Sequence, residues 1–139
     1  MARTIQDVMT RNPVTVNASD PTTVAARQMR DRDIGTVIVL ENNSVCGIVT
    51  DRDIVVREVA EGKDPNECTI GELCSKELTT LEPSASVDDA IQMMREKAIR
   101  RLPVVQNGTA VGIVSIGDLA EVKDPDSALA DISSAPANN

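Results

Sequence analysis

The hydrophobic pattern of this chain alternates between two periods. Short runs rich in β-branched residues, each ending near turn residues, are typical of buried strands. They cover residues 14–16, 36–40, 45–50, 79–81, 101–105 and 110–115. Between these runs, apolar residues recur three or four positions apart, which predicts helices that begin near residues 20, 51, 86 and 117. Two shorter capped turns are predicted at residues 4–9 and 69–74.

The order of these predicted elements occurs twice. Residues 4–54 align with residues 69–119 without a gap and share 14 identical residues. Most of these are apolar or lie at helix caps, as a common core requires, but the pair Asp53 and Asp118 is not explained by a core. Each half reads strand–helix–strand–strand–helix, which predicts a three-stranded sheet with helices on one face. Because a half of about 50 residues buries too little surface to be stable alone, we expect the two sheets to pack together about a pseudo-twofold axis.

The repeat also predicts where the chain divides. We expect a first repeat over residues 1–60, a polar linker over residues 61–68, and a second repeat over residues 69–123. Glycine and proline interrupt the linker, as is typical of a connection between folded elements. Residues 124–139 are small and polar in large part, and this composition predicts a disordered tail.

One motif in each half points to chemistry. Residues 47–50 form an apolar run that ends in Thr50, with Asp53 three positions later, and residues 112–115 end in Ser115, with Asp118 three positions later. A hydroxyl at a helix N-cap and a carboxylate in the first turn would lie beside unpaired backbone N–H groups, which favour anions. A hydroxyl for a phosphate and a carboxylate for two sugar hydroxyls would suit a nucleotide. Alternatively, both motifs are only capping boxes, and residues 51–53 are a charge cluster at a helix start.

Composition excludes several classes of function. The chain has 22 acidic and 14 basic residues, a net charge of −8, and no basic stripe, so a general nucleic-acid surface is not expected. It has no Trp, Tyr or Phe on which a base could stack. It also has no histidine, the commonest general base and metal ligand. With no evident nucleophile–base pair either, we predict no catalytic residues and no enzyme activity.

The cysteines give no sign of a metal site or a disulfide framework. Cys46, Cys68 and Cys74 are odd in number and lack a CxxC spacing, so we predict buried small residues or idle thiols, with no metal site and no required cofactor. No run approaches 18 apolar residues, and the N-terminus has no long apolar core. We therefore expect neither a membrane span nor a signal peptide, and a soluble cytoplasmic protein.

Together the motifs resemble a known family. Each half resembles the CBS domain, and the pair resembles a stand-alone Bateman module; the resemblance covers residues 4 to about 120. It is carried by residues 7–9, 13–16, 34–35, 47–54, 100–105 and 112–115, with Asp118. The resemblance implies an α+β fold in which each repeat has a short helix or strand followed by an α-β-β-α unit with a three-stranded sheet.

The resemblance also implies a function. CBS pairs are regulatory sensors of adenosine-type ligands such as AMP, ADP or ATP, bound in clefts between the two repeats. In that family, the matching aspartates bind ribose hydroxyls and the matching Ser or Thr approaches phosphate. Backbone near the first strand lines the adenine slot, and a basic residue reaches phosphate across the pseudo-dyad. The corresponding residues here are Thr50, Asp53, Ser115, Asp118, Thr15, Val16, Thr80, Leu81, Arg101 and, beside it, Arg100.

The two halves depart from each other at the basic position. Gly35 and Thr36 stand where the second half has Arg100 and Arg101, and Ile38 replaces a proline. We therefore expect two unequal sites, of which the Asp53 site receives Arg101 and takes a phosphorylated ligand first. Alternatively, the two arginines are a solvated pair at a strand edge.

Two further expectations concern the output of the protein. A non-catalytic module must signal through an unknown protein partner or through its own assembly, and the resemblance suggests a homodimer. Apolar residues expected to face outward and form its interface are Val8, Met9, Val55, Val56, Leu73 and Leu119. The alternative function is a ligand-free scaffold or interaction protein that uses the same fold.

Overall fold

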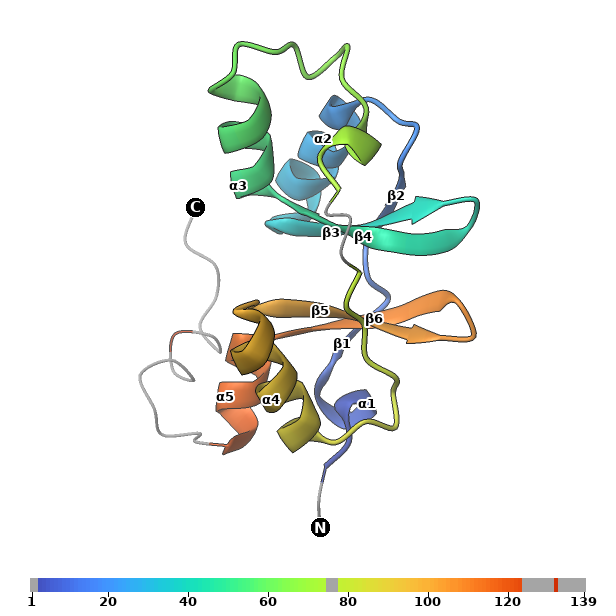
Figure 1. Cartoon of the computed structure of the whole chain (residues 1–139), viewed down its shortest axis with the longest axis vertical. Coiled ribbons are helices and arrows are strands. Elements are labelled where there is room, and N and C mark those ends of the chain that lie inside the picture. The colour runs from blue at the N-terminus through green and yellow to red at the C-terminus, as the bar shows by residue number, and fades with distance from the viewer. Residues whose placement is uncertain (1–2, 75–77, 124–131, 133–139) are drawn as a thin grey trace. The chain divides into compact units, whose positions relative to one another are not determined.

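The computed structural model describes residues 3–74, 78–123 and 132. It confirms the predicted α+β class, with two three-stranded sheets and helices packed on them (Figure 1). The chain forms two compact units. We call residues 13–78 the central unit, and residues 1–12 together with residues 79–139 the terminal unit.

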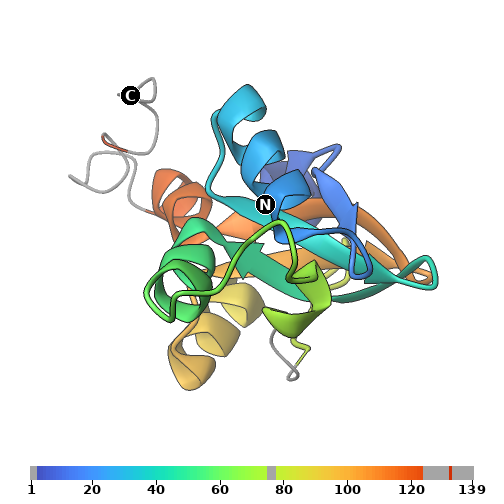
Figure 2. The ribbon, with the colours of Figure 1, turned by 90° about the horizontal axis from the view of Figure 1, so that it is seen from above.

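The central unit is built on the sheet β2-β3-β4, in which β3 runs parallel to β2 and antiparallel to β4. Its elements are β2 (Thr15–Asn17), α2 (Thr22–Arg32), β3 (Thr36–Glu41), β4 (Ser44–Thr50), α3 (Asp51–Ile54), the π-helix η1 (Val55–Val59) and the 3-10 helix η2 (Ile70–Glu72). The β3–β4 hairpin turns at Asn42 and Asn43, which have φ angles of 53° and 66°. Asparagine tolerates this left-handed conformation, which two-residue hairpins need. The hairpin tip extends away from α3 (Figures 1 and 2).

The terminal unit has the sheet order β1-β6-β5, with both pairings antiparallel. Its elements are α1 (Ile5–Val8), β1 (Thr10–Arg11), α4 (Val87–Lys97), β5 (Arg101–Gln106), β6 (Thr109–Ser115) and α5 (Ile116–Lys123). Asn107 and Gly108, both at positive φ, form the turn of the β5–β6 hairpin. Helix α4 begins at the predicted cap, where Ser86 Oγ accepts a hydrogen bond from the Asp89 N–H.

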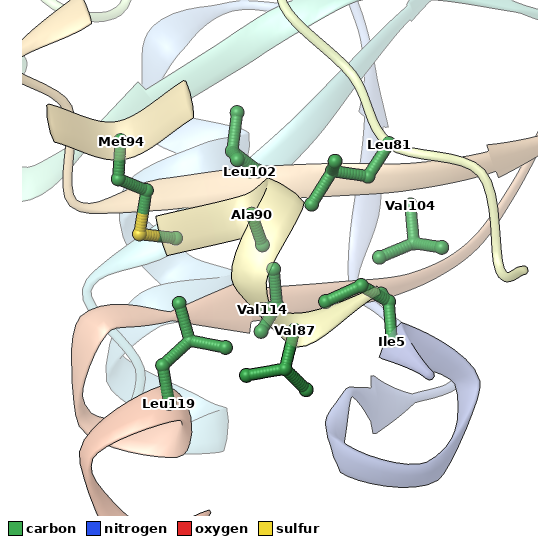
Figure 3. Packing of buried hydrophobic residues seen from close by; sticks show 9 residues of the cluster. All are labelled: Ile5, Leu81, Val87, Ala90, Met94, Leu102, Val104, Val114 and Leu119. Carbon is green, nitrogen blue, oxygen red and sulfur yellow. The ribbon is translucent and has the colours of Figure 1, made fainter. Parts of the chain in front are cut away.

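Each unit has its own hydrophobic core. In the terminal unit, side chains from α1, α4, α5 and the two long strands meet over one face of the sheet (Figure 3). They are Ile5, Leu81, Val87, Ala90, Met94, Leu102, Val104, Val114 and Leu119. In the central unit the corresponding cluster contains Val16, Ala25, Met29, Val37, Val39, Val49, Ile54, Ile70 and Leu73. Burial of these apolar side chains is the main term that holds each unit together.

The compact units do not follow the boundaries of the sequence repeat. Ile5 opens the first repeat but is fully buried in the core of the terminal unit, and Ile70 opens the second repeat but is fully buried in the central core. Backbone hydrogen bonds fix both segments, from the Ile5 N–H to the Ala85 carbonyl and from the Ile70 N–H to the Asp20 carbonyl. The two repeats therefore exchange their first turns, because each turn supplies an apolar residue to the other repeat's sheet.

Most predicted elements occur within one or two residues of their expected bounds, with three differences. The expected strand at residues 79–81 is reduced to a single bridge, between Leu81 and Val104. The helix expected to begin near residue 51 is one α-helical turn followed by the π-helix η1. Strand β1 was not predicted from the sequence, and it is a strand because it pairs with β6. The predicted disordered tail lies, apart from residue 132, outside the described residues.

The expected outward apolar residues divide into two groups. Val55 and Val56 are exposed, as predicted. The prediction was wrong for Leu73 and Leu119, each only 3% exposed, because the first fills the central core after η2 and the second lies on the inner face of α5. Val8 and Met9 are half-buried against the terminal core, so they are not outward-facing either.

The N-terminal segment packs closely against Gly112, and a substitution at Gly112 tests this packing. Gly112 pairs with Arg11 of β1, and a Cβ atom there would lie 2.9 Å from the Thr10 carbonyl oxygen and would overlap the Met9 side chain. We expect Gly112→Ala to lower the free energy of unfolding by about 1–3 kcal/mol, the usual cost of overpacking. Chemical denaturation measures this loss. The double variant with Met9→Ala should recover only part of it, because the backbone overlap remains; full stability in Gly112→Ala would contradict the close approach.

Candidate functional site

The candidate site of the central unit lies where β4 passes into α3. Thr50 caps the helix, and its Oγ1 accepts a hydrogen bond from the Asp53 N–H at 3.2 Å. In return, the Thr50 N–H donates to Asp53 Oδ2 at 2.9 Å. The local sequence causes this geometry, because a β-branched strand ends in a hydroxyl residue and a carboxylate occupies the third helical position. Both side chains are half-buried.

The terminal unit repeats this junction between β6 and α5. The Ser115 N–H donates to Asp118 Oδ2 at 2.9 Å, and the Asp118 N–H donates to Ser115 Oγ at 3.2 Å. Both copies therefore form a capping box. The cap uses one oxygen of each aspartate; within the described part of the chain, no hydrogen bond to either Oδ1 is found. Each carboxylate is thus held in a fixed orientation with acceptor capacity remaining.

The backbone around the two junctions also matches. Thr36 is the ladder partner of Thr50, and Arg101 is the ladder partner of Ser115. The Asp51 N–H donates to the Gly35 carbonyl at 3.0 Å, and the corresponding bond in the terminal unit, from Ile116 to Arg100, measures 2.9 Å. The junctions therefore differ in side chains rather than in backbone.

At the positions where the two junctions differ, the side chains are exposed and charged in the terminal unit but include a buried hydroxyl in the central unit. Arg100 and Arg101 are exposed, and neither forms an ion pair with any residue that the structure describes. In the central unit, Thr36 Oγ1 is buried without a hydrogen-bond partner among the described residues. A buried unpaired hydroxyl is costly unless water or a ligand satisfies it. No local sequence signal points to this unpaired hydroxyl, because its burial depends on what surrounds the β3 strand.

The remaining predicted site residues lie on the first strand of each repeat or its remnant. Thr15 is exposed on β2, whereas Val16 is 5% exposed and belongs to the central core. Thr80 is half-buried, and Leu81 is in the terminal core. The side chains of Val16 and Leu81 are therefore not available to a ligand, and the role that the family resemblance implies for these residues is a backbone role. The Leu81 N–H and carbonyl already bond to Pro103 and Val105 of β5.

Each unit has a surface cavity: the cavity of the central unit lies away from its junction, whereas the cavity of the terminal unit borders the first turn of α5. One of about 620 Å³ is in the central unit at the hairpin end of the sheet, opposite to Thr50, and is lined by Asn17, Ser19, Glu41, Asn43 and Glu72 among others. The other, of about 290 Å³, is an apolar groove between α4 and α5. Neither is lined by a predicted nucleotide-binding residue.

The three cysteines are all in the central unit but have different surroundings. Cys46 and Cys74 are half-buried against the central core, with their Sγ atoms 3.4 Å apart, so they are thiols in contact rather than a disulfide. Burial, together with the hydrogen bond and the charge of Cys46, raises the pKa of Cys74 to about 12. Partial burial and the carboxylates of Glu58 and Glu72 raise the pKa of Cys68.

The raised pKa predicts slow chemistry at Cys74. The thiolate is the reactive form, and with a pKa of about 12 only a very small fraction of Cys74 is ionised at pH 8. We expect iodoacetamide to modify Cys74 in the native protein at least about tenfold more slowly than in the denatured chain, even after allowing for the greater nucleophilicity of a basic thiolate. Peptide mass spectrometry over a time course measures both rates. Equal rates would contradict the assigned environment.

Comparison with known proteins identifies the family. The model of the family described as CBS domain matches residues 5–59 and again residues 70–124. The chain belongs to the CBS-domain family. The two matches coincide with the sequence repeat, so the repeat, rather than the compact unit, is the CBS domain as the family defines it.

Similar CBS proteins are known from several organisms. The CBS domain-containing protein YhcV of Bacillus subtilis is 39% identical over 116 residues, which are 84% of this chain and 82% of that protein. Hypoxic response protein 1 of Mycobacterium tuberculosis is 36% identical over 118 residues, covering 84% and 82%. The crystal structure of Hypoxic Response Protein I with two coordinated zinc ions has a TM-score of 0.77 at 35% identity, covering 85% of this chain and 97% of that one. A hexameric CBS-CP12 protein from bloom-forming cyanobacteria has a TM-score of 0.78 at 29% identity, covering 95% and 81%.

These relationships support a CBS-pair regulatory module. The names of these relatives state no catalytic activity. Within the described residues, no helix is both long enough and apolar enough to cross a membrane. The absence of enzyme activity and the cytoplasmic location stay predictions.

Proposed function

We propose that this CBS pair is a non-catalytic regulatory module that binds an adenosine-type nucleotide of the AMP, ADP or ATP class at its strand-to-helix junctions. Asp53 and Asp118 accept hydrogen bonds from ribose hydroxyls, and Thr50 and Ser115 contact phosphate. One observation carries the proposal: in both units the cap fixes the aspartate through Oδ2 and leaves acceptor capacity on Oδ1. A carboxylate with this orientation suits the two adjacent hydroxyls of a ribose.

The composition of the chain limits how the base is held. With no aromatic residue in the sequence, an adenine must be bound by aliphatic side chains and backbone groups. Thr15 and Val16 lie on β2, which pairs with β3, and Thr80 precedes the Leu81 bridge to β5. Because the Leu81 N–H and carbonyl already bond to Pro103 and Val105, we assign the base contact in the terminal unit to the backbone of Thr80. The unpaired hydroxyl of Thr36 supports a ligand or water beside Thr50, its ladder partner.

Equilibrium dialysis against adenosine, AMP, ADP and ATP tests the proposal directly. We expect at least one phosphorylated nucleotide to bind, and mass spectrometry of ligand released from the purified protein should identify the same class. GMP serves as the control for the base. If no member of the panel binds to the folded protein, the ligand-free scaffold replaces this function.

The scaffold alternative has an observation of its own. Val55, Val56 and Val59 on η1 are 56%, 45% and 57% exposed, which is unusual for three valines on one short helical segment. We propose that this valine patch forms part of an interface in a homodimer, or with a protein partner. The hexameric CBS-CP12 protein supports self-association as a property available to similar chains. Light scattering across a dilution series should give twice the mass of one chain; the mass of a single chain throughout would exclude the dimer.

A further inference from the structure

Three side chains of the central unit converge at a place that the nucleotide proposal does not use. Glu58 belongs to η1, Cys68 precedes η2, and Glu72 ends η2. The Sγ of Cys68 and one carboxylate oxygen from each glutamate lie within 4.8 Å of one another. These residue types are metal ligands when deprotonated.

The deepest member of this group is an unpaired buried acid. Glu58 is only 2% exposed. Its Oε2 accepts a hydrogen bond from Thr22 Oγ1 at 3.0 Å, whereas its Oε1 is buried and has no partner among the described residues. A buried carboxylate oxygen without a partner costs free energy that a bound cation would offset. The Thr22 contact holds the side chain, and Oε1 is the oxygen that stays available.

The backbone holds the other two ligand candidates in place. The Cys68 N–H donates to the Asp64 carbonyl, and the Cys68 carbonyl accepts from the Thr22 N–H at 2.9 Å. The Glu72 N–H donates to the Thr69 carbonyl in the 3-10 turn. The first turn of α2 therefore bonds to both Glu58 and Cys68, through Thr22 in each case, and fixes these two ligand candidates relative to each other.

The charges and the exposure of the group favour a cation that enters from solvent. Two acidic side chains, Glu58 and Glu72, lie beside the Cys68 Sγ. Exposure increases from the buried Glu58 through the half-buried Cys68 to the exposed Glu72. An ion arriving at Glu72 would thus reach the unpaired oxygen of Glu58 by way of the thiol.

We propose that Glu58, Cys68 and Glu72 form a binding site for a divalent transition-metal ion of the Zn²⁺ type, with solvent as the fourth ligand. A thiolate beside two carboxylates favours such an ion over Mg²⁺ or Ca²⁺, which prefer oxygen ligands alone. Ligand bonds of about 2.0–2.3 Å bring tetrahedral ligands to roughly 3.5 Å from one another. The group therefore has to contract by about an ångström, and the exposed side chain of Glu72 has the freedom to do so.

Cobalt binding to the full chain tests the site. Protein freed of metal with a chelator is titrated with Co²⁺, whose bond to a thiolate gives a charge-transfer absorption, and then with Zn²⁺ as competitor. We expect close to one ion per chain, displaced by Zn²⁺ and not by Mg²⁺. Cys68→Ser should abolish the absorption, and Glu72→Gln should weaken binding by about tenfold or more, since a charged ligand is lost.

Cys46→Val is the matched control. It removes another thiol of the same unit, and the second repeat has Val111 at the equivalent position. Cobalt binding should be unchanged in this variant, with circular dichroism confirming that every variant is folded. Loss of the absorption in Cys46→Val but not in Cys68→Ser would move the metal to the Cys46–Cys74 pair and overturn the proposal. Absence of any Co²⁺ or Zn²⁺ retention by the wild type would overturn it as well.

Discussion

Asp53→Ala is expected to weaken the binding of AMP, ADP and ATP by at least about tenfold, because each charge-assisted hydrogen bond to a ribose hydroxyl contributes about 1.5–3 kcal/mol. Isothermal titration calorimetry on the wild type and the variant measures the change. The substitution also removes the bond from the Thr50 N–H to Asp53 Oδ2, so a loss of stability of about 0.5–2 kcal/mol, as for other helix caps, is expected alongside. Titrations must therefore be made well below the melting temperature of the variant.

Asp51→Ala is the matched control for this prediction. Asp51 is an exposed carboxylate in the same first turn of α3, and its Oδ1 accepts a hydrogen bond from the Arg52 N–H. Its removal changes the net charge by the same amount but leaves the capping box in place. Nucleotide affinity should be nearly unchanged. An equal loss in both variants would mean that the local negative charge, rather than a ribose contact at Asp53, governs binding.

Arg101→Ala is expected to reduce the affinity for AMP and ATP by about tenfold to a hundredfold while leaving adenosine nearly unaffected. An arginine that binds phosphate through two N–H groups contributes nothing to the nucleoside. The effect should be large here because the protein carries a net charge of −8, against which a phosphate needs a local cation. Arg95→Ala, which removes an exposed arginine from α4, is the control for net charge. Equal losses for adenosine and AMP would show that the assignment of Arg101 is wrong.

A second experiment tests which aspartate shares its ligand with Arg101. The family resemblance assigns Arg101 to the ligand of Asp53, whereas within the terminal unit Arg101 is the ladder partner of Ser115, beside Asp118. If Arg101 acts on the Asp53 ligand, Arg101→Ala should have little further effect in an Asp53→Ala background and its full effect in an Asp118→Ala background. The reverse result assigns it to Asp118. The two nucleotide sites are also expected to differ in affinity, so a titration should give close to one phosphorylated nucleotide per chain at moderate concentration. Two sites of equal affinity would contradict this expectation.

Local signals were sufficient to predict most of the secondary structure. The β-branched runs became strands β3 to β6, and the Asn107-Gly108 pair became a hairpin, because strand and turn preferences act over a few residues. The junctions at Thr50 and Ser115 were predictable for the same reason, since a capping box is a bond between residues three apart. The predictions failed where local preference was weak. Residues 79–81 pair with β5 at only one position, and β1 exists only through its contact with β6.

The sequence by itself determined that this protein is two copies of one α+β repeat, with a carboxylate shortly after β4 and after β6. Both features could be recognised because they depend on residues that are close together or that recur at a fixed period. Only the tertiary structure decided three other features. It placed Ile5 in the core of the second repeat's sheet and Ile70 in the core of the first repeat's sheet. The sequence pattern could not decide this, because the two turns are equivalent and either would fit either sheet. The tertiary structure buried Thr36 Oγ1 without a partner among the described residues. It also joined Glu58 to Cys68 and Glu72, whose approach depends on how η1, the connecting loop and η2 pack around the start of α2, a contact that no local pattern encodes.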